Sequence, residues 1–409
     1  MKKRIGIIGF GEMGKRHAKE INEATGGLVE LAGVYEPHDL NYRKGCEWIE
    51  AEPKRYDSLP KMIAKAKLDG IIIASPNTFH LDNLNALEGR EFTILIEKPL
   101  DVDVDKISAI ARFAAKYKGG IIVDHVMRYA PIVRRAKQII DDGLLGKVCS
   151  FHFIQRHAGG ALFHTFRRSL KGGGGQMLEK ATHDLDVMLF LTNATPRRVA
   201  SIGKQQVYGG NKPNNLHCTH CAEKIYCISA THAGKDENAD IKDVSTNNDL
   251  CPFAREVDVF DNETSLIELD NNIFGTYSHC YFTETKYSRE YEIIGSKGTM
   301  TISFSGNPDG KLMYFPRGKS GEIQEYKFNY SGKIHYFGGK YIGLHFYDVM
   351  CGREKPFSTV NQAFVAEMLA CAAMEAQKKK TFVNVEDIIP GDLKKTYNSI
   401  YATSGAIAQ

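Results

Sequence analysis

The chain has 409 residues and a formal net charge of +4; 43% of its residues are hydrophobic and 25% are charged. This length suggests two domains, and the composition is ordinary for a globular protein. The small net charge argues against a nucleic-acid-binding protein, and no apolar run is long enough to span a membrane. The first residues lead into a strand pattern without a signal-peptide cleavage site, so we expect a cytoplasmic protein.

An apolar run from residue 4 predicts a buried parallel strand. It leads into a G-x-G-x-x-G pattern and then a helical pattern over Lys15–Ala24. The first glycine permits a tight turn, the second lets a pyrophosphate approach the backbone, and the third lets the helix pack on the strand. The helix N-terminus adds free N–H groups and the positive end of its dipole. The expected phosphate-binding turn consists of Gly9, Phe10, Gly11, Glu12, Met13 and Gly14.

A second strand pattern, Leu28–Tyr35, ends at Glu36, about twenty residues beyond the last glycine. An acid at this place accepts hydrogen bonds from the ribose hydroxyls and repels a 2′-phosphate, so the sequence favours NAD over NADP. The alternative for Glu36 is a solvated residue at a strand end. Nearby Arg43 and Lys44 keep NADP open as the less favoured cofactor.

Strand and helix patterns alternate through residues 1–126, which we interpret as a dinucleotide-binding domain with about six strands in a doubly wound parallel sheet. Helices are expected over 59–66, 81–87 and 105–117, and strands over 70–74, 92–96 and 120–123. Two loops follow strands at the carboxyl edge of the sheet, where a cofactor binds. They supply further candidate cofactor contacts: Ser75, Pro76, Asn77 and His80 in one loop, and Glu97 and Lys98 in the other.

Residues 127–409 predict an α+β domain for substrate binding and oligomerisation, with a large, mostly antiparallel, open-faced sheet. Strands are expected over 147–155, 197–207, 263–269, 273–282, 290–294 and 299–304, and helices over 177–191, 358–377 and from Pro131. Because apolar residues point to both faces, one face needs covering, and we expect a homodimer or homotetramer. The residues that suggest this are Ile273, Phe274, Tyr277, Tyr281 and Phe282.

A polar insertion at about residues 208–252 contains four of the nine cysteines: Cys218, Cys221, Cys227 and Cys251. Cys-x2-Cys is a chelating spacing, and four thiolates suit tetrahedral zinc, so we expect a structural zinc site. His217, His220 or His232 could replace one thiol. Reduced thiols in a loop and an iron–sulfur cluster are the alternatives.

Several motifs together resemble the Gfo/Idh/MocA (glucose–fructose oxidoreductase / inositol dehydrogenase) family over essentially the whole chain. They are the turn at 9–14, the loop at 74–80, Glu97-Lys98-Pro99, the segment 128–131 and the segment 172–186. The resemblance implies that Lys98 orients the reacting hydroxyl beside the nicotinamide and that a cis bond precedes Pro99. It also implies that His183 is the general base or acid, a role that suits the pKa of histidine.

Glu179 and His183 are spaced i, i+4, so one helix face would carry both. The four glycines before them let a substrate approach the helix start, whereas the alternative is an ordinary surface Glu–His pair. The family usually has Asp and Gly where this chain has Glu179 and Ala181, which affects substrate placement. Asp186 could orient His183 or form a salt bridge. An anionic sugar could contact a group of basic residues, for which the alternative is a solvated charged loop: Arg156, His157, His164, Arg167 and Arg168.

The function that this resemblance implies is an NAD(H)-dependent oxidoreductase. It would transfer hydride between the nicotinamide and a hydroxyl or carbonyl of a sugar, polyol, inositol or sugar derivative, with Lys98, His183 and Glu179 as catalytic residues. One alternative is a redox glycosidase or isomerase that recycles bound NAD through a transient keto-sugar. The other is a catalytically silent NAD-binding sensor, against which the presence of Lys98 and His183 argues.

Overall fold

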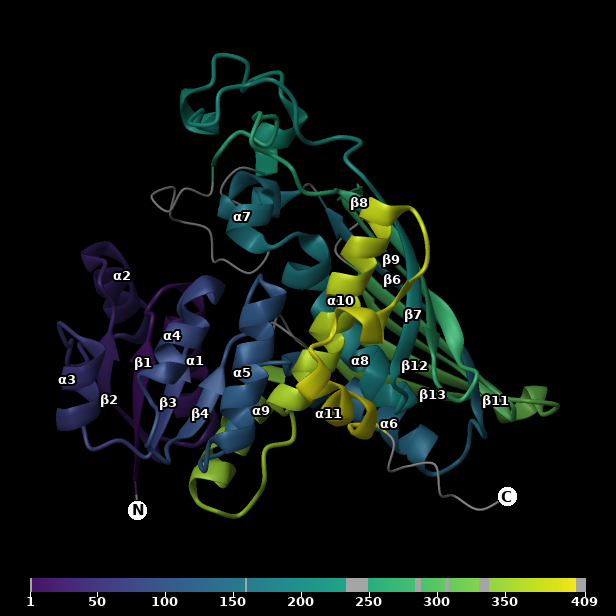
Figure 1. Cartoon of the computed structure of the whole chain (residues 1–409), viewed down its shortest axis with the longest axis horizontal. Coiled ribbons are helices and arrows are strands. Elements are labelled where there is room, and N and C mark those ends of the chain that lie inside the picture. The colour runs from purple at the N-terminus through teal and green to yellow at the C-terminus, as the bar shows by residue number, and fades with distance from the viewer. Residues whose placement is uncertain are drawn as a thin grey trace. The chain divides into compact units, whose positions relative to one another are not determined.

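The computed structural model describes residues 2–158, 160–232, 249–283, 288–305, 309–330 and 338–401 (Figure 1). The chain divides into two compact units. Unit 1 consists of Met1–Pro131, Ile334–Glu367 and Pro390–Ile400, and unit 2 of Ile132–Lys333, Met368–Ile389 and Tyr401–Gln409. Two late segments therefore belong to unit 1, although the sequence analysis assigns everything after residue 126 to the second domain.

Within the described residues, unit 1 contains a five-stranded parallel sheet in the order β2-β1-β3-β4-β5. The strands are β1 (Lys3–Ile8), β2 (Val29–Tyr35), β3 (Gly70–Ile73), β4 (Thr93–Ile96) and β5 (Ile121–Val123). Their β-branched side chains are almost completely buried, as expected for a parallel sheet that helices cover on both faces. The expectation of about six strands is wrong for this sheet as described, because the chain leaves β5 through a 3₁₀ turn at Val126–Tyr129.

Seven α-helices of unit 1 lie in the described segments: α1 (Glu12–Ala24), α2 (Asp39–Ile49), α3 (Leu59–Lys65), α4 (His80–Asn85), α5 (Val104–Lys116), α9 (Gly338–Met350) and α11 (Lys394–Ser399). Helix α9 comes from late in the sequence and packs on α1, where Gly343 lies against Ile21. The sequence analysis does not include α9. Its apolar face completes the cover of a sheet formed more than two hundred residues earlier.

Unit 2 is built on a sheet with nine described strands in the order β13-β12-β11-β10-β6-β9-β8-β7-β14. Neighbouring strands are antiparallel except β6 and β9, which are parallel, so the expected mostly antiparallel sheet is confirmed. The strands are β6 (Val148–Ala158), β7 (Pro196–Lys204), β8 (Asn262–Leu269), β9 (Phe274–Thr283), β10 (Ser288–Gly295), β11 (Gly298–Ser305), β12 (Asp309–Pro316), β13 (Gln324–Asn329) and β14 (Val383–Asn384).

Helices cover one face of this sheet, as Figure 1 shows for α8 and α10. They are α6 (Pro131–Asp141), α8 (Thr182–Thr192) and the second half of α10 (Val360–Lys379), with the short α7 (Leu170–Gly173) beside the insertion. Side chains on the covered face are buried, including Tyr277 and Tyr281. The other face exposes apolar side chains: Ile202, Leu266 and Phe274 are 70%, 45% and 58% exposed. No helix in the described ranges is long and apolar enough to cross a membrane.

Candidate active site

In the turn between β1 and α1, the fold requires glycine at two positions, Gly9 and Gly14, because a side chain would not fit there. Gly9 has a positive φ of +85°, and a Cβ there would lie 2.7 Å from the carbonyl oxygen of Ala74. A Cβ on Gly14 would lie 2.0 Å from the Gly9 carbonyl oxygen. A Cβ on Gly11, in contrast, would meet nothing within 4 Å. The backbone at Gly11 therefore faces open space at the N-terminus of α1, where a phosphate can approach it.

Glu36, the predicted ribose-binding residue, lies against this turn. Its carboxylate is buried and accepts hydrogen bonds from the backbone N–H groups of Phe10, at 2.8 Å, and His38, at 2.9 Å. Each carboxylate oxygen has a second lone pair that a ribose hydroxyl could use. Arg55 also lies here: its Nε donates to the Glu36 carbonyl oxygen, and its guanidinium pairs with Asp39.

The pairing of Arg55 bears on the choice of cofactor. The hydrogen bond from Arg55 lowers the pKa of Asp39, which keeps the carboxylate charged beside the guanidinium. The Arg55 guanidinium, which donates to the backbone of Glu36, is thus already paired with an anion. Sequence reasoning considers Arg43 and Lys44 but misses Arg55, because the parallel bridge between Arg55 and Val34 brings it to the end of β2.

The loop after β3 is held by His80, a predicted cofactor contact. The ring is completely buried, with Nδ1 3.0 Å from the Leu100 carbonyl oxygen and Nε2 3.1 Å from that of Ser75. Burial lowers the pKa of His80. The structure therefore shows His80 tying together the two predicted cofactor loops. Ser75 and Asn77 are half-buried and Pro76 is exposed on the same loop.

Glu97 and Lys98 follow β4 at the same edge of the sheet. The Lys98–Pro99 bond is cis, as the resemblance implies. Lys98 is half-buried, whereas Glu97 is buried and has its Oε1 2.8 Å from Nε2 of His17 in α1. Asp124, directly after β5, has its Oδ2 3.5 Å from the same His17 nitrogen. Sequence reasoning predicts Glu97 as a cofactor contact but does not predict His17 and Asp124, which lie far from it in sequence.

The predicted zinc ligands are not gathered at ligand spacing. In the part of the chain that the structure describes, one group of three or more His, Cys, Asp and Glu has all its ligand atoms within 4.8 Å: His17, Glu97 and Asp124. Zinc–sulfur bonds of about 2.3 Å would bring four thiols closer than that. Cys218 and Cys251 are buried, and burial, followed by the neighbouring Cys251 and Cys227, raises the pKa of Cys218 to about 12.

Two basic residues that the sequence analysis considers as contacts of an anionic substrate anchor the insertion instead. Arg168 is 1% exposed and donates to the carbonyl oxygens of Cys251, at 2.8 Å, and Asn214, at 2.6 Å. It also pairs with Glu256. Nδ1 of His164 lies 2.9 Å from the carbonyl oxygen of Leu250. The described contacts of these two residues therefore support a structural role and give no support to a substrate role.

Glu179 lies in a π-helical turn, Met177–Ala181, that precedes α8. Gly174 and Gly175, with φ of +76° and +90°, lead the chain into this turn. The Oε1 atom of Glu179 is 2.8 Å from Nε of Arg167, and both Glu179 and His183 are buried. The expected continuous α-helix from 177 is wrong at its first turn, because i→i+5 hydrogen bonds widen it. Such π turns are frequent at functional sites.

Asp184, the residue after His183, is the centre of a buried polar cluster under α8. Its carboxylate is 2.6 Å from Nε of Arg289 and accepts hydrogen bonds from the hydroxyls of Tyr291 and Tyr277. These contacts fix the first turn of α8, which carries His183. Sequence reasoning considers Asp186, either to orient His183 or in a salt bridge, and does not include Asp184, because the partners of Asp184 are on β9 and β10, about a hundred residues later.

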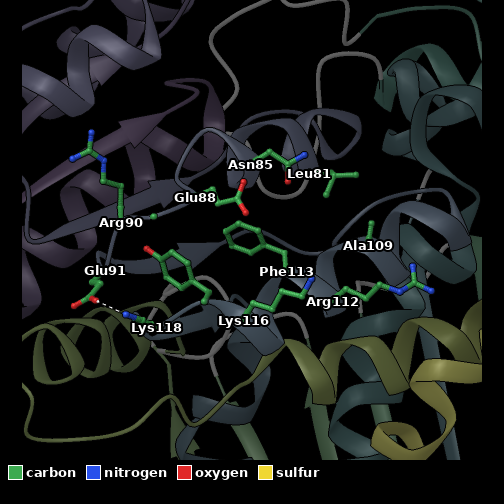
Figure 2. A pocket seen from close by; sticks show the side chains of 12 residues that line it. Leu81, Asn85, Glu88, Arg90, Glu91, Ala109, Arg112, Phe113, Lys116 and Lys118 are labelled. Carbon is green, nitrogen blue, oxygen red and sulfur yellow. Dashed lines mark ion pairs between the residues drawn. The ribbon is translucent and has the colours of Figure 1, made fainter.

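A separate cavity of about 410 Å³ lies in unit 1 between α4, the following loop and α5. Figure 2 shows Phe113 in the middle of the lining side chains, between Glu88 and Lys116. Arg112 is already paired with Asp392, at 2.7 Å. None of the predicted site residues lines this cavity, so it is distinct from the glycine turn and the loop at Lys98.

Comparisons with known proteins agree with this geometry. The sequence profile described as "Oxidoreductase family, NAD-binding Rossmann fold" (Gfo/Idh/MocA) matches residues 3–125, and that of the Gfo/Idh/MocA C-terminal domain matches residues 133–301. The chain is 28% identical over 207 residues to the rhizopine catabolism protein MocA of Rhizobium meliloti, which covers 51% of this chain and 62% of that protein.

It is also 26% identical over 199 residues to inositol 2-dehydrogenase of Rhizobium meliloti, covering 48% of this chain and 57% of that protein. The chain thus spans less than two thirds of the length of these two relatives. Among solved structures, levoglucosan dehydrogenase in complex with NADH and levoglucosan has a TM-score of 0.74 at 16% identity, covering 94% of this chain and 100% of that one. The two profile matches together span more than half of the sequence, and the chain belongs to the Gfo/Idh/MocA family of oxidoreductases.

Proposed function

We propose that the protein is an NAD(H)-dependent oxidoreductase that acts on a hydroxyl or carbonyl group of a carbohydrate, polyol or inositol. The observation that carries the proposal is the open backbone at Gly11 with the Glu36 carboxylate held beside the same turn. This pairing fits a pyrophosphate and an unphosphorylated ribose. When bound, NAD supplies the hydride acceptor, and the chain must provide binding, orientation and proton transfer.

The proposed roles follow from the chemistry of alcohol oxidation. Lys98 donates a hydrogen bond to the reacting hydroxyl and orients it, and His183 accepts the hydroxyl proton as the C–H bond breaks. Glu179 positions the substrate or the imidazole, and Arg167 holds its carboxylate. The Asp184 cluster fixes the turn that carries His183. The carbohydrate or polyol substrate is supported by the names of the relatives, inositol 2-dehydrogenase and levoglucosan dehydrogenase.

The test is a screen in which the protein is mixed with NAD or NADP and a panel of sugars, uronic acids, inositols and glycosides. We expect the near-ultraviolet absorbance of NADH to rise with NAD and at least one hydroxyl substrate. A glycoside or isomer that is converted without NADH accumulation would favour the redox-neutral enzyme. Full NAD binding without turnover of any compound would favour the sensor.

The zinc site at Cys218, Cys221, Cys227 and Cys251 stays a prediction within this function. Its support is the Cys-x2-Cys spacing, together with the burial of two of the four thiols, Cys218 and Cys251. Elemental analysis of the purified protein should find about one zinc per chain, and Cys218→Ser should remove it. Metal-free protein with unchanged thermal stability would contradict the prediction.

A further inference from the structure

Three ionisable side chains, His17, Glu97 and Asp124, meet in the interior of unit 1. They come from the second turn of α1, the end of β4 and the end of β5. Nε2 of His17 lies 2.8 Å from Oε1 of Glu97 and 3.5 Å from Oδ2 of Asp124. All three are buried. Such a group is costly to bury unless its charges compensate one another.

The charges compensate one another if His17 and Asp124 are protonated. Burial by itself would lower the pKa of His17, but the hydrogen bond to Glu97 and the charges of Asp124, Glu97 and Glu20 outweigh it and raise the pKa to about 9. Burial and the negative charge of Glu97 raise the pKa of Asp124 well above its usual range. Glu97 keeps a lowered pKa of about 2, because the contacts with His17 outweigh burial. The cluster then contains an imidazolium, one carboxylate and one carboxylic acid, with no net charge.

The cluster connects two elements that the proposed reaction needs in fixed positions, α1 and the segment after β4. Helix α1 begins at the glycine turn that faces the phosphates, and Glu97 is bonded through the main chain to Lys98. The Glu97 backbone N–H is fixed to the Ile73 carbonyl oxygen, at 2.9 Å, and that of Asp124 to the Ile96 carbonyl oxygen, at 2.8 Å. The side-chain contact between His17 and Glu97 is thus a direct link from the phosphate-binding helix to the segment that carries Lys98.

We propose that His17 and Asp124 are positioning residues for Lys98, and that the His17–Glu97–Asp124 cluster is occupied by protons and holds no metal ion. This rests on the proposed function insofar as Lys98 acts on the substrate. A distance of 2.8 Å between the imidazole nitrogen and the carboxylate oxygen is that of a charge-assisted hydrogen bond. The position of Lys98 is then set by the same contact that sets α1.

A kinetic comparison of buried histidines tests the positioning role. His17→Leu should lower kcat by about 10-fold to 100-fold, because a small displacement of a reacting group is costly, with little change in KM for NAD. His17→Gln, which keeps an N–H donor, should recover part of the loss. The matched control is His345→Leu, since His345 is also buried in unit 1 and its printed partners are Glu354 and the backbone of Phe357. Equal losses in kcat for His17→Leu and His345→Leu would overturn the proposal.

A second measurement does not depend on turnover. In the NMR spectrum of the free protein, His17 should titrate near pH 9, and Glu97→Gln should lower this pKa by more than one unit, since the hydrogen bond and most of the counter-charge are lost. The resonance of selectively dimethylated Lys98 should shift in His17→Leu and not in His345→Leu. The neighbouring titratable groups that must be accounted for are Glu20 on α1, Lys98 after β4 and His80 on α4.

Two results of the NMR experiment would overturn the inference. One is titration of His17 at the ordinary pKa of histidine; the other is a Lys98 resonance unchanged by His17→Leu. Addition of Zn²⁺ should stabilise the wild type and His17→Leu equally, and stabilisation of the wild type alone would make the cluster a metal site. If no substrate is turned over but His17 and Lys98 respond as expected, the proposed function fails and the positioning inference survives.

Discussion

Single residues carry the proposed chemistry, and two of them, Lys98 and His183, come from separate compact units of the chain. Some side chains interact with the substrate only when charge develops in the transition state. Removing such a side chain lowers kcat more than it weakens binding. Lys98→Ala and His183→Ala should therefore each lower kcat by roughly 10²- to 10⁴-fold, with NAD affinity nearly unchanged. Steady-state kinetics on the best substrate and NAD titration by fluorescence measure the two quantities.

The control for this prediction is an exposed lysine. Lys61, on the surface and paired with Asp57, should tolerate alanine without a change in kcat. Near-normal turnover and pH dependence in His183→Ala would mean that the base is another group. Glu179 would then be the first candidate.

The choice between NAD and NADP depends on Glu36. Glu36→Ala removes a carboxylate that would bind the ribose and that also accepts the backbone N–H groups of Phe10 and His38. We expect NAD affinity to fall by about 10-fold to 100-fold, because a charge-assisted hydrogen bond contributes roughly 1.5–3 kcal/mol. NADP should bind the variant relatively better. Calorimetric titration of both cofactors measures this, and tighter NADP binding to the wild type would refute the assignment.

At the scale of elements, the sequence predicts the βαβ pattern and its loops correctly because apolar runs and glycines are local signals. The resemblance also implies the cis bond at Lys98–Pro99, which the structure has, whereas the contact of Glu36 with the glycine turn is seen only in the structure. The π turn at Met177–Ala181 was not, since its side-chain pattern is that of an α-helix. The Asp184 cluster and the partners of Glu97 depend on residues distant in sequence, which one chain without its fold cannot reveal.

The insertion that begins after β7 is an element whose stability should depend on one buried side chain. Arg168→Met removes hydrogen bonds to Cys251, Asn214 and Glu256. We expect the free energy of unfolding to fall by roughly 2–4 kcal/mol, less than for a fully buried ion pair because Glu256 is partly exposed. Urea unfolding followed by tyrosine and tryptophan fluorescence provides this value.

The matched control for the insertion is Arg156→Met. Arg156 pairs with Glu290 across β6 and β10 at 2.8 Å, but both side chains are partly exposed, so the change should be within about 1 kcal/mol. Limited proteolysis should cut the insertion faster in Arg168→Met and not in Arg156→Met. Equal stability of the two variants would show that Arg168 does not anchor this element.

For the whole molecule, the uncovered face of the nine-stranded sheet bears on assembly. The sequence argument for an oligomer named Tyr277 and Tyr281, which the structure buries on the helix-covered face. Phe274 is on the other face with Ile202 and Leu266, because β7, β8 and β9 pair in a register that places these three side chains on the same side. We propose that this face, centred on Ile202, Leu266 and Phe274, forms a contact between identical chains.

The oligomer proposal predicts that a charge at the centre of this face weakens assembly. Ile202→Glu should shift the protein toward the monomer in size-exclusion chromatography with light scattering at micromolar concentration, because a buried carboxylate is costly. Ile225→Glu is the control, since Ile225 is equally exposed but belongs to the insertion. A wild type that is monomeric at every concentration tested would exclude the proposal.

The account as a whole depends on hydride transfer from a carbon–hydrogen bond of the substrate to NAD. The most direct measurement uses a substrate deuterated at the reacting carbinol carbon and locates the label by mass spectrometry and NMR of the recovered nicotinamide. We predict deuterium at C4 of the dihydronicotinamide, in step with formation of the carbonyl product, and loss of this transfer in His183→Ala. Formation of product without deuterium in the nicotinamide would contradict the account.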